Sequence, residues 1–240
     1  ADCGIAMASG AQAASQVAQL VLLDSDFGAL PHVVAEGRRV INNIERAASL
    51  YLVKNIFSLI LAVISITAAF SYPLTPSQLT LMSLLAIGIP SLILALEPNE
   101  NLVQGKFLRN AILRALPAAF TDLFIIIFVL LFQQAFQINN NEISTITALL
   151  VTIVGFFMLW KVAKPVNRLH VGMMAGLIAA LVFIVLFLPG LFSLSPLSFG
   201  GYLILILFTL LIPSVIWLLN KALEGLLLLL QKAEGGKRAA

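Results

Sequence analysis

The fold is decided by a stretch that begins with Arg38-Arg39-Val40-Ile41-Asn42-Asn43-Ile44-Glu45-Arg46 and continues without a Gly or Pro to Phe70. In its first part, apolar residues recur at helical spacing among charges, whereas residues 56–70 are almost wholly apolar. A helix over residues 38–70 would be on the order of 50 Å long, enough to cross a bilayer and project into water. We therefore expect a stalk that continues into a first transmembrane helix.

The composition indicates a polytopic membrane protein. Hydrophobic residues make up 60% of the 240 residues and charged residues 10%, against a soluble average of about 25% charged. The net charge of +3 comes from Lys and Arg scattered over short loops, so we expect no nucleic-acid binding. Cys3 is the single cysteine, which excludes an intrachain disulfide and a cysteine-based metal cluster.

Six apolar stretches have a length close to the roughly 20 residues that a membrane-spanning helix needs. The sequence therefore predicts an all-α polytopic membrane protein with six transmembrane helices. The predicted stalk and spans cover residues 38–70, 79–96, 117–136, 146–160, 171–192 and 202–219, and residues 220–240 form the predicted tail.

The charges of the loops predict the orientation. Lys and Arg occur before the first span, between the second and third, between the fourth and fifth, and after the sixth. The other three loops contain no Lys or Arg, and Glu142 is their single charge. Because positive loops stay in the cytoplasm, we expect both termini to be cytoplasmic and the protein to cross the cell (plasma) membrane several times.

Residues 1–37 have the pattern of an incomplete α/β domain. Residues 3–8 are apolar, residues 12–19 read as a helix rich in Ala and Gln, and residues 20–23 read as a buried strand. Asp24 and Asp26 supply acceptors that can cap a helix beginning near Phe27. About 35 residues are too few to bury a core of their own, so we expect the chain to begin partway through a larger protein.

The same residues resemble the end of the phosphorylation domain of cation-transporting P-type (E1-E2) ATPases, as found in bacterial calcium and cation pumps. The resemblance rests on residues 1–7, the helix of residues 10–18, residues 20–24 with Phe27, Glu36-Gly37-Arg38, and the pair Asn42-Asn43. It implies a HAD-like fold for the segment, followed by the last six membrane helices. It also implies that the full-length enzyme uses ATP and Mg²⁺ to move an inorganic cation through an aspartyl-phosphate.

The family motifs DKTGT and GDGxND are absent from this chain. The resemblance therefore implies that the amino-terminal half of the pump is missing, and that the chain alone should be inactive as an ATPase. No catalytic residue and no metal site is assigned within it. The predicted partners are the lipid bilayer, this missing half and the transported cation.

Lys54 is the main charged residue of the first span, and it shares a helix face with Ser58 one turn later. One interpretation is a lysine that extends to the cytoplasmic headgroups; the other is an ammonium that supplies a counter-charge at a transport site. Aligned on Asn42-Asn43, the family resemblance places Asn55 and Ser58 at positions where calcium pumps have a coordinating Asn and Glu. Both residues are candidate ligands of the cation pathway.

The second span resembles the sixth helix of these pumps. There Ser83, Ala86 and Ile87 stand where calcium pumps have an Asn, a Thr and an Asp, which makes Ser83 a third candidate ligand and leaves two positions apolar. Gly88 and Pro90 predict an irregular helix here. Either the helix is loosened so that backbone carbonyls can face the interior of the bundle, or it has a kink that serves only packing. Since calcium takes six to eight oxygens, the resemblance implies that the fourth membrane helix, outside this chain, contributes most ligands.

Asp122 lies in the third predicted span, after Pro117. We expect an interfacial position or a pair with Arg114, two turns earlier, and the alternative is an ion relay.

The sequence therefore predicts the membrane-transport portion of an ATP-driven cation pump. A non-enzymatic membrane scaffold or regulatory module derived from a pump is the rival interpretation. A secondary transporter is disfavoured because the spans show no internal repeat.

Overall fold

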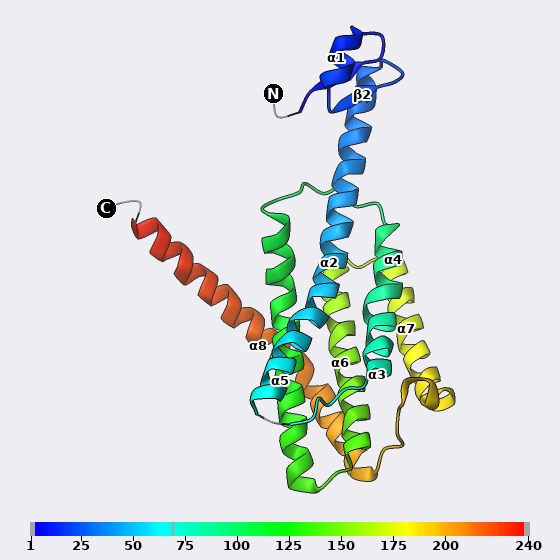
Figure 1. Ribbon diagram of the computed structural model, residues 1–240, viewed down its shortest axis with the longest axis vertical. Helices are drawn as coiled ribbons and strands as arrows, with labels where there is room; N and C mark the ends of the chain where they lie inside the picture. Colours follow the sequence, from blue (N-terminus) through cyan, green and yellow to red (C-terminus); the bar gives the residue numbers. More distant parts are fainter. Residues whose placement is uncertain (1–2, 69, 238–240) are drawn as a thin grey trace. The chain divides into compact units, whose positions relative to one another are not determined.

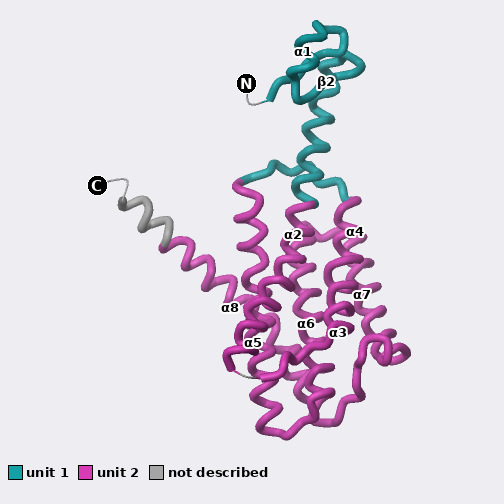
Figure 2. The backbone as a smooth tube through the Cα atoms, viewed as in Figure 1, with its two compact units in different colours: residues 1–43, 97–104 teal, residues 44–96, 105–240 magenta. Residues whose placement is uncertain are grey.

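The computed structural model describes residues 3–68 and 70–237, with side chains described as far as residue 229. The chain divides into two compact units (Figure 2). One unit contains residues 1–43 and 97–104, and the other contains residues 44–96 and 105–240. Ala1 and Asp2 of the family resemblance, and residues 238–240 of the predicted tail, lie outside the described residues.

The first unit contains a small β-α-β motif. Strands β1 (Ile5–Met7) and β2 (Leu20–Leu22) pair in parallel, with Ile5 opposite Leu20, and helix α1 (Gln12–Val17) connects them. The Asp26 carboxylate accepts a hydrogen bond of 2.7 Å from the backbone N–H of Gly28 and caps the short 3-10 helix η1 (Phe27–Ala29). The order of elements agrees with the α/β pattern of the sequence, although the strands form a minor part of the chain.

Helix α2 (Leu30–Thr67) is continuous (Figure 1). It begins earlier than the predicted stalk, because Pro31 falls in the first turn, where its missing N–H removes no helical hydrogen bond. Gly37 is accommodated inside the helix. Residues 30–43 of α2 belong to the first unit and residues 44–67 to the second.

Within the part of the chain that the structure describes, six helices have the length and hydropathy to cross a membrane, as predicted. The first is α2. The others are the interrupted helix Pro76–Ala95, α5 (Phe107–Phe136), α6 (Asn140–Val162), α7 (Arg168–Phe187) and α8 (Phe199–Lys237).

Prolines do not delimit these helices where the sequence suggested. Pro117 lies inside α5, which begins at Phe107 rather than near the proline. Helix α8 contains Pro213, as does the predicted span 202–219, and it continues past residue 219 to Lys237. By contrast, α7 ends at Phe187, and Pro189–Phe192 form the 3-10 helix η3.

Helix α6 lies at the centre of the second unit. It packs against α5, α8, α7 and the helix of the second span, and 78% of its most apolar window is buried, the largest share among the six helices. The core contains Phe57 and Leu61 from α2, Leu81 and Ile87 from the second span, and Leu150 from α6, each at most 1% exposed.

Candidate cation pathway

Lys54 and Ser83 are brought together by the packing of α2 against the second span. The Lys54 Nζ donates to Ser83 Oγ at 2.7 Å, and Ser83 Oγ donates to the backbone carbonyl of Leu79 at 2.6 Å. Both side chains are partly buried. The ammonium is thus held between two helices in this structure, and two of the four candidate residues are in direct contact.

The second span changes its hydrogen-bonding pattern at Ser83. Helix α3 (Pro76–Met82) is followed by the π-helix η2 (Ser83–Gly88) and then by α4 (Ile89–Ala95). The N–H of Ile89 bonds to the carbonyl of Leu84, five residues earlier, and the Gly88 carbonyl accepts from Ser91 Oγ at 3.0 Å. The sequence indicated an irregularity here from Gly88 and Pro90. A π-helix widens the helix and often marks functional sites.

Gly155 of α6 allows close contact with η2. A Cβ at position 155 would lie 2.5 Å from the Cβ of Ala86, closer than real Cβ atoms approach one another. Ala86 is 1% exposed, so it is fixed in the core of the bundle. The π-helix is therefore packed directly against the backbone of α6.

Ser58 faces the segment that follows α2. Its Oγ is 3.0 Å from the hydroxyl of Tyr72, and either atom can donate this hydrogen bond. Tyr72 also lines a cavity of about 640 Å³ between the end of α2, residues 70–75, α5 and α6. The polar residues of this cavity include Tyr72, Gln133, Gln134, Asn140, Asn141 and Ser144. Ser58 is thus connected to the cavity through its hydrogen bond with Tyr72.

Asn55 is not brought together with the other candidates. It is exposed, on a face of α2 that also presents Tyr51, Leu59, Val63 and Ile66. An amide without partners is costly in hydrocarbon, so an apolar face containing Asn55 is poorly suited to lipid alone.

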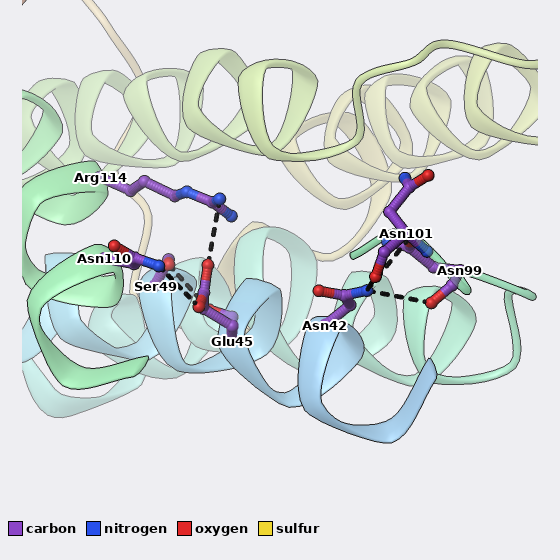
Figure 3. Close-up of polar contacts among 7 residues, drawn as sticks. All are labelled: Asn42, Glu45, Ser49, Asn99, Asn101, Asn110 and Arg114. Carbon is purple, nitrogen blue, oxygen red and sulfur yellow. Dashed lines mark hydrogen bonds and ion pairs between the residues drawn. The ribbon is translucent and has the colours of Figure 1, made fainter. Parts of the chain in front are cut away.

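The pair Asn42-Asn43 ties α2 to the loop that follows the second span. In the first unit, Asn42 Nδ2 donates to the carbonyls of Asn101 at 2.9 Å and Asn99 at 3.1 Å (Figure 3). Asn43 Nδ2 donates to the carbonyl of Glu97 at 2.9 Å. The sequence marked the pair by resemblance, but it did not identify these partners.

Glu45 joins α2 to α5 in the second unit. Its carboxylate pairs with Arg114 at 3.0 Å and accepts from Asn110 Nδ2 at 3.2 Å (Figure 3). The Glu45 side chain is 7% exposed and the Arg114 side chain 47% exposed. The guanidinium of Arg114 therefore forms its ion pair with Glu45.

The predicted pairing of Asp122 with Arg114 is wrong. Asp122 has no exposed surface, and neither carboxylate oxygen has a hydrogen-bond partner among the described residues. Arg114, two turns earlier on α5, instead pairs with Glu45 of α2. The interfacial position of Asp122 stays a prediction.

Gln78 is a connecting residue that sequence reasoning missed. It forms a capping box with Thr75, donates to the Ser193 carbonyl at 3.1 Å, and accepts from Ser144 Oγ at 2.6 Å. It is 1% exposed. The pattern Thr-x-x-Gln at residues 75–78 is a helix-start signature that could have identified the cap, whereas the contacts with Ser144 and Ser193 depend on tertiary structure.

Six apolar helices with polar groups held between them define a polytopic α-helical membrane protein. Relatives refine this class. The chain is 39% identical over 173 residues to the probable cation-transporting ATPase exp7 of Streptococcus pneumoniae, covering 69% of this chain and 22% of that protein. It is 34% identical over 212 residues to the calcium-transporting ATPase CtpE of Mycolicibacterium smegmatis, covering 81% of this chain and 27% of that protein.

A shorter match, 34% identical over 102 residues, relates the chain to the P-type sodium-transporting ATPase4 of Toxoplasma gondii, covering 42% of this chain and 8% of that protein. No protein-family model matches the chain. On the strength of these relatives, the chain belongs to the cation-transporting P-type ATPases. It spans about a quarter of the length of the first two, at 22% and 27%.

Proposed function

We propose that this chain is the membrane-transport portion of an ATP-driven cation pump, and that it couples the ion pathway to a phosphorylation domain. The continuity of α2 from Leu30 to Thr67 carries the proposal. One helix includes the Asn42-Asn43 contacts near its start and the Lys54–Ser83 contact further along. A helix with this backbone continuity can transmit a displacement along its axis.

The β1-α1-β2 motif is, in this proposal, the end of a HAD-like phosphorylation domain. The rest of that domain, with ATP and Mg²⁺, belongs to the amino-terminal half of the pump. The described residues contain no group of three or more His, Cys, Asp or Glu side chains that could hold a metal ion. No chemical step with ATP or Mg²⁺ is assigned to the residues of this chain.

The ion pathway, in this proposal, passes between α2 and the second span. Ser58 and Ser83 are candidate ligands, and the Lys54 ammonium replaces the cation when the site empties. Support comes from the 2.7 Å contact of Lys54 with Ser83 and from the π-helix that begins at Ser83. The cavity beside Tyr72 is then the outer end of the pathway.

Asn55 contributes to this pathway from an exposed position of α2. Its exposure within an apolar stripe supports a partner helix outside this chain, which we propose to be the fourth membrane helix of the pump. That helix supplies the acidic oxygens that α2 and the second span lack. A divalent cation needs several such ligands.

Loop charges support cytoplasmic termini and a position in the cell membrane, with the Tyr72 cavity on the outer side. The name of one relative, the calcium-transporting ATPase CtpE of Mycolicibacterium smegmatis, makes Ca²⁺ the first cation to test. The rival function, a scaffold or regulatory module without catalysis, is not favoured by relatives that are named ATPases.

Formation of a phosphoenzyme tests the proposal. The full-length protein, incubated with labelled ATP and Mg²⁺, should form an acid-stable phosphoenzyme that depends on the transported cation, with Ca²⁺ tried first. The 240-residue chain alone should form none with any cation. A phosphoenzyme on the isolated chain, or its absence from full-length protein under all cations, would refute the proposal.

A further inference from the structure

Asp122 is a buried carboxyl group that the proposed pathway does not use. It is 0% exposed, and neither of its oxygens has a hydrogen-bond partner among the described residues. The neighbours one turn away on the same helix are apolar and buried: Ala118, Ala119, Ile125 and Ile126. On its own helix, the carboxyl group therefore has apolar, buried neighbours one turn before and one turn after it.

The described charged residues on the helices next to α5 interact with groups other than Asp122 or are exposed. On α6, Glu142 accepts from Ser198 at 2.6 Å, and Lys161 bonds to Asn220 of α8. On α8, Lys221 lies over the ring of Trp217, and Glu224 is exposed.

On α2, Glu45 pairs with Arg114, Lys54 bonds to Ser83, and Glu36 pairs with Arg39. Arg46 of α2 is buried, and it donates no hydrogen bond to Asp122. The contacts of the described residues thus give Asp122 no counter-charge on α2, α6 or α8.

These surroundings select a proton as the ligand. An ionised carboxylate without a counter-charge or hydrogen bonds is strongly disfavoured in a low-dielectric interior, whereas a neutral carboxylic acid is tolerated. A metal ion needs several oxygen or nitrogen ligands, and no group of three or more acidic, His or Cys residues exists among the described residues.

We propose that Asp122 is a proton-binding site of the membrane portion, separate from the Lys54–Ser83 contact, that holds a proton in the arrangement seen here and exchanges it during the pump cycle. The exchange rests on the proposed pump function. The carboxyl oxygen takes up a proton from water on one side of the membrane while α5 gives access to that side, and it releases the proton to water on the other side after α5 has bent.

Helix α5 has a weak point one turn before Asp122 at which it can open. Pro117 has no N–H and leaves the carbonyl of Leu113 without its helical partner. Thr121 Oγ1 donates to the Pro117 carbonyl at 2.7 Å, a contact that often bends helices. Bending at this point would change the access of water to the adjacent carboxyl group.

The full-length pump in sealed vesicles provides the test, with Ca²⁺ as the driven cation, a trapped pH-sensitive dye and ATP added outside. We expect Asp122→Asn to keep Ca²⁺ uptake and to lower the number of protons moved per transport cycle by about one, because an amide takes up no proton. Asp122→Glu should retain the wild-type ratio. Glu224→Gln, which removes an exposed carboxylate from α8, is the matched control and should leave the ratio unchanged.

Infrared spectroscopy gives a second readout that does not require transport. The absorption of a protonated carboxyl group at neutral pH should be lost in Asp122→Asn and kept in Glu224→Gln. An unchanged proton ratio and an unchanged spectrum in Asp122→Asn would overturn the inference, as would equal proton losses in the Asn and Glu variants. Wild-type protein that moves no cation would instead refute the pump function, and the infrared band would still decide whether Asp122 holds a proton.

Discussion

At the scale of single residues, Lys54 is where the structure bears most directly on mechanism. In the full-length pump we expect Lys54→Ala to slow dephosphorylation on the order of tenfold, because a charged hydrogen bond contributes about 1.5 to 3 kcal/mol. Lys54→Arg should retain part of the rate. Rapid quenching of labelled phosphoenzyme measures this step.

Lys221→Ala is the control for Lys54, since it removes a lysine whose contact is the ring of Trp217 at 4.4 Å. It should leave dephosphorylation unchanged. Wild-type dephosphorylation in well-expressed Lys54→Ala protein would remove the counter-charge role and leave a lysine that only packs between helices.

Two ion pairs of α2 differ in burial and should differ in energy. Glu45→Gln is expected to destabilise the protein by about 1 to 3 kcal/mol, because Glu45 is largely buried and bonds to Arg114 and Asn110. Glu36→Gln should change stability by less than about 0.5 kcal/mol, because its pair with Arg39 is exposed. Thermal unfolding in detergent measures both, and equal Tm values for the two variants would contradict the assignment.

At the scale of elements, the contact between α6 and η2 depends on the absence of a side chain at Gly155. Gly155→Ala should lower stability by about 1 to 3 kcal/mol, because the added methyl group would overlap Ala86. Gly172→Ala in α7 is the matched control, since a Cβ there meets no atom within 4 Å. Thermal unfolding distinguishes them; an equally stable Gly155→Ala protein would show that the two helices are not packed this closely.

The helices themselves were predictable because a long apolar segment in lipid must satisfy its backbone hydrogen bonds internally, which an α-helix does. The residues at which the helices begin and end were harder to predict. Pro117 suggested the start of a span, yet it lies inside α5, whose neighbouring turns maintain the backbone. The break at Ser83 was indicated by Gly88 and Pro90, but its form as a π-helix depends on packing that local sequence does not determine.

The partners of polar residues were the least predictable part of the site. Glu45 and Asn110 are 65 positions apart, and Asn42 and Asn99 are 57 apart. No periodicity links residues at such distances. Lys54 and Ser83 were separately identified as candidates for the cation pathway from the sequence. Their hydrogen bond to each other was not predicted, because it depends on the tertiary structure.

At the scale of the whole molecule, the loop charges predict which residues face the outside. In a Cys3→Ala background, a cysteine at exposed Asn140 should react with an impermeant thiol reagent added to intact cells, and one at exposed Asn101 should react only after the membrane is opened. Cys3, the single native cysteine, offers a further marker of the inner side. Labelling of Asn101→Cys from outside would contradict the orientation.

The most direct measurement of the central claim is ATP-driven cation uptake by the full-length protein in purified vesicles. We expect uptake of labelled Ca²⁺, or of another inorganic cation in its place, that requires ATP and stops when the phosphoenzyme is blocked. Leu186→Ala, at an exposed apolar position of α7, should transport like the wild type and serves as a control for substitutions in the membrane helices. Sealed, correctly inserted protein that moved none of Ca²⁺, Mg²⁺, Mn²⁺, Na⁺ or K⁺ with ATP would contradict it.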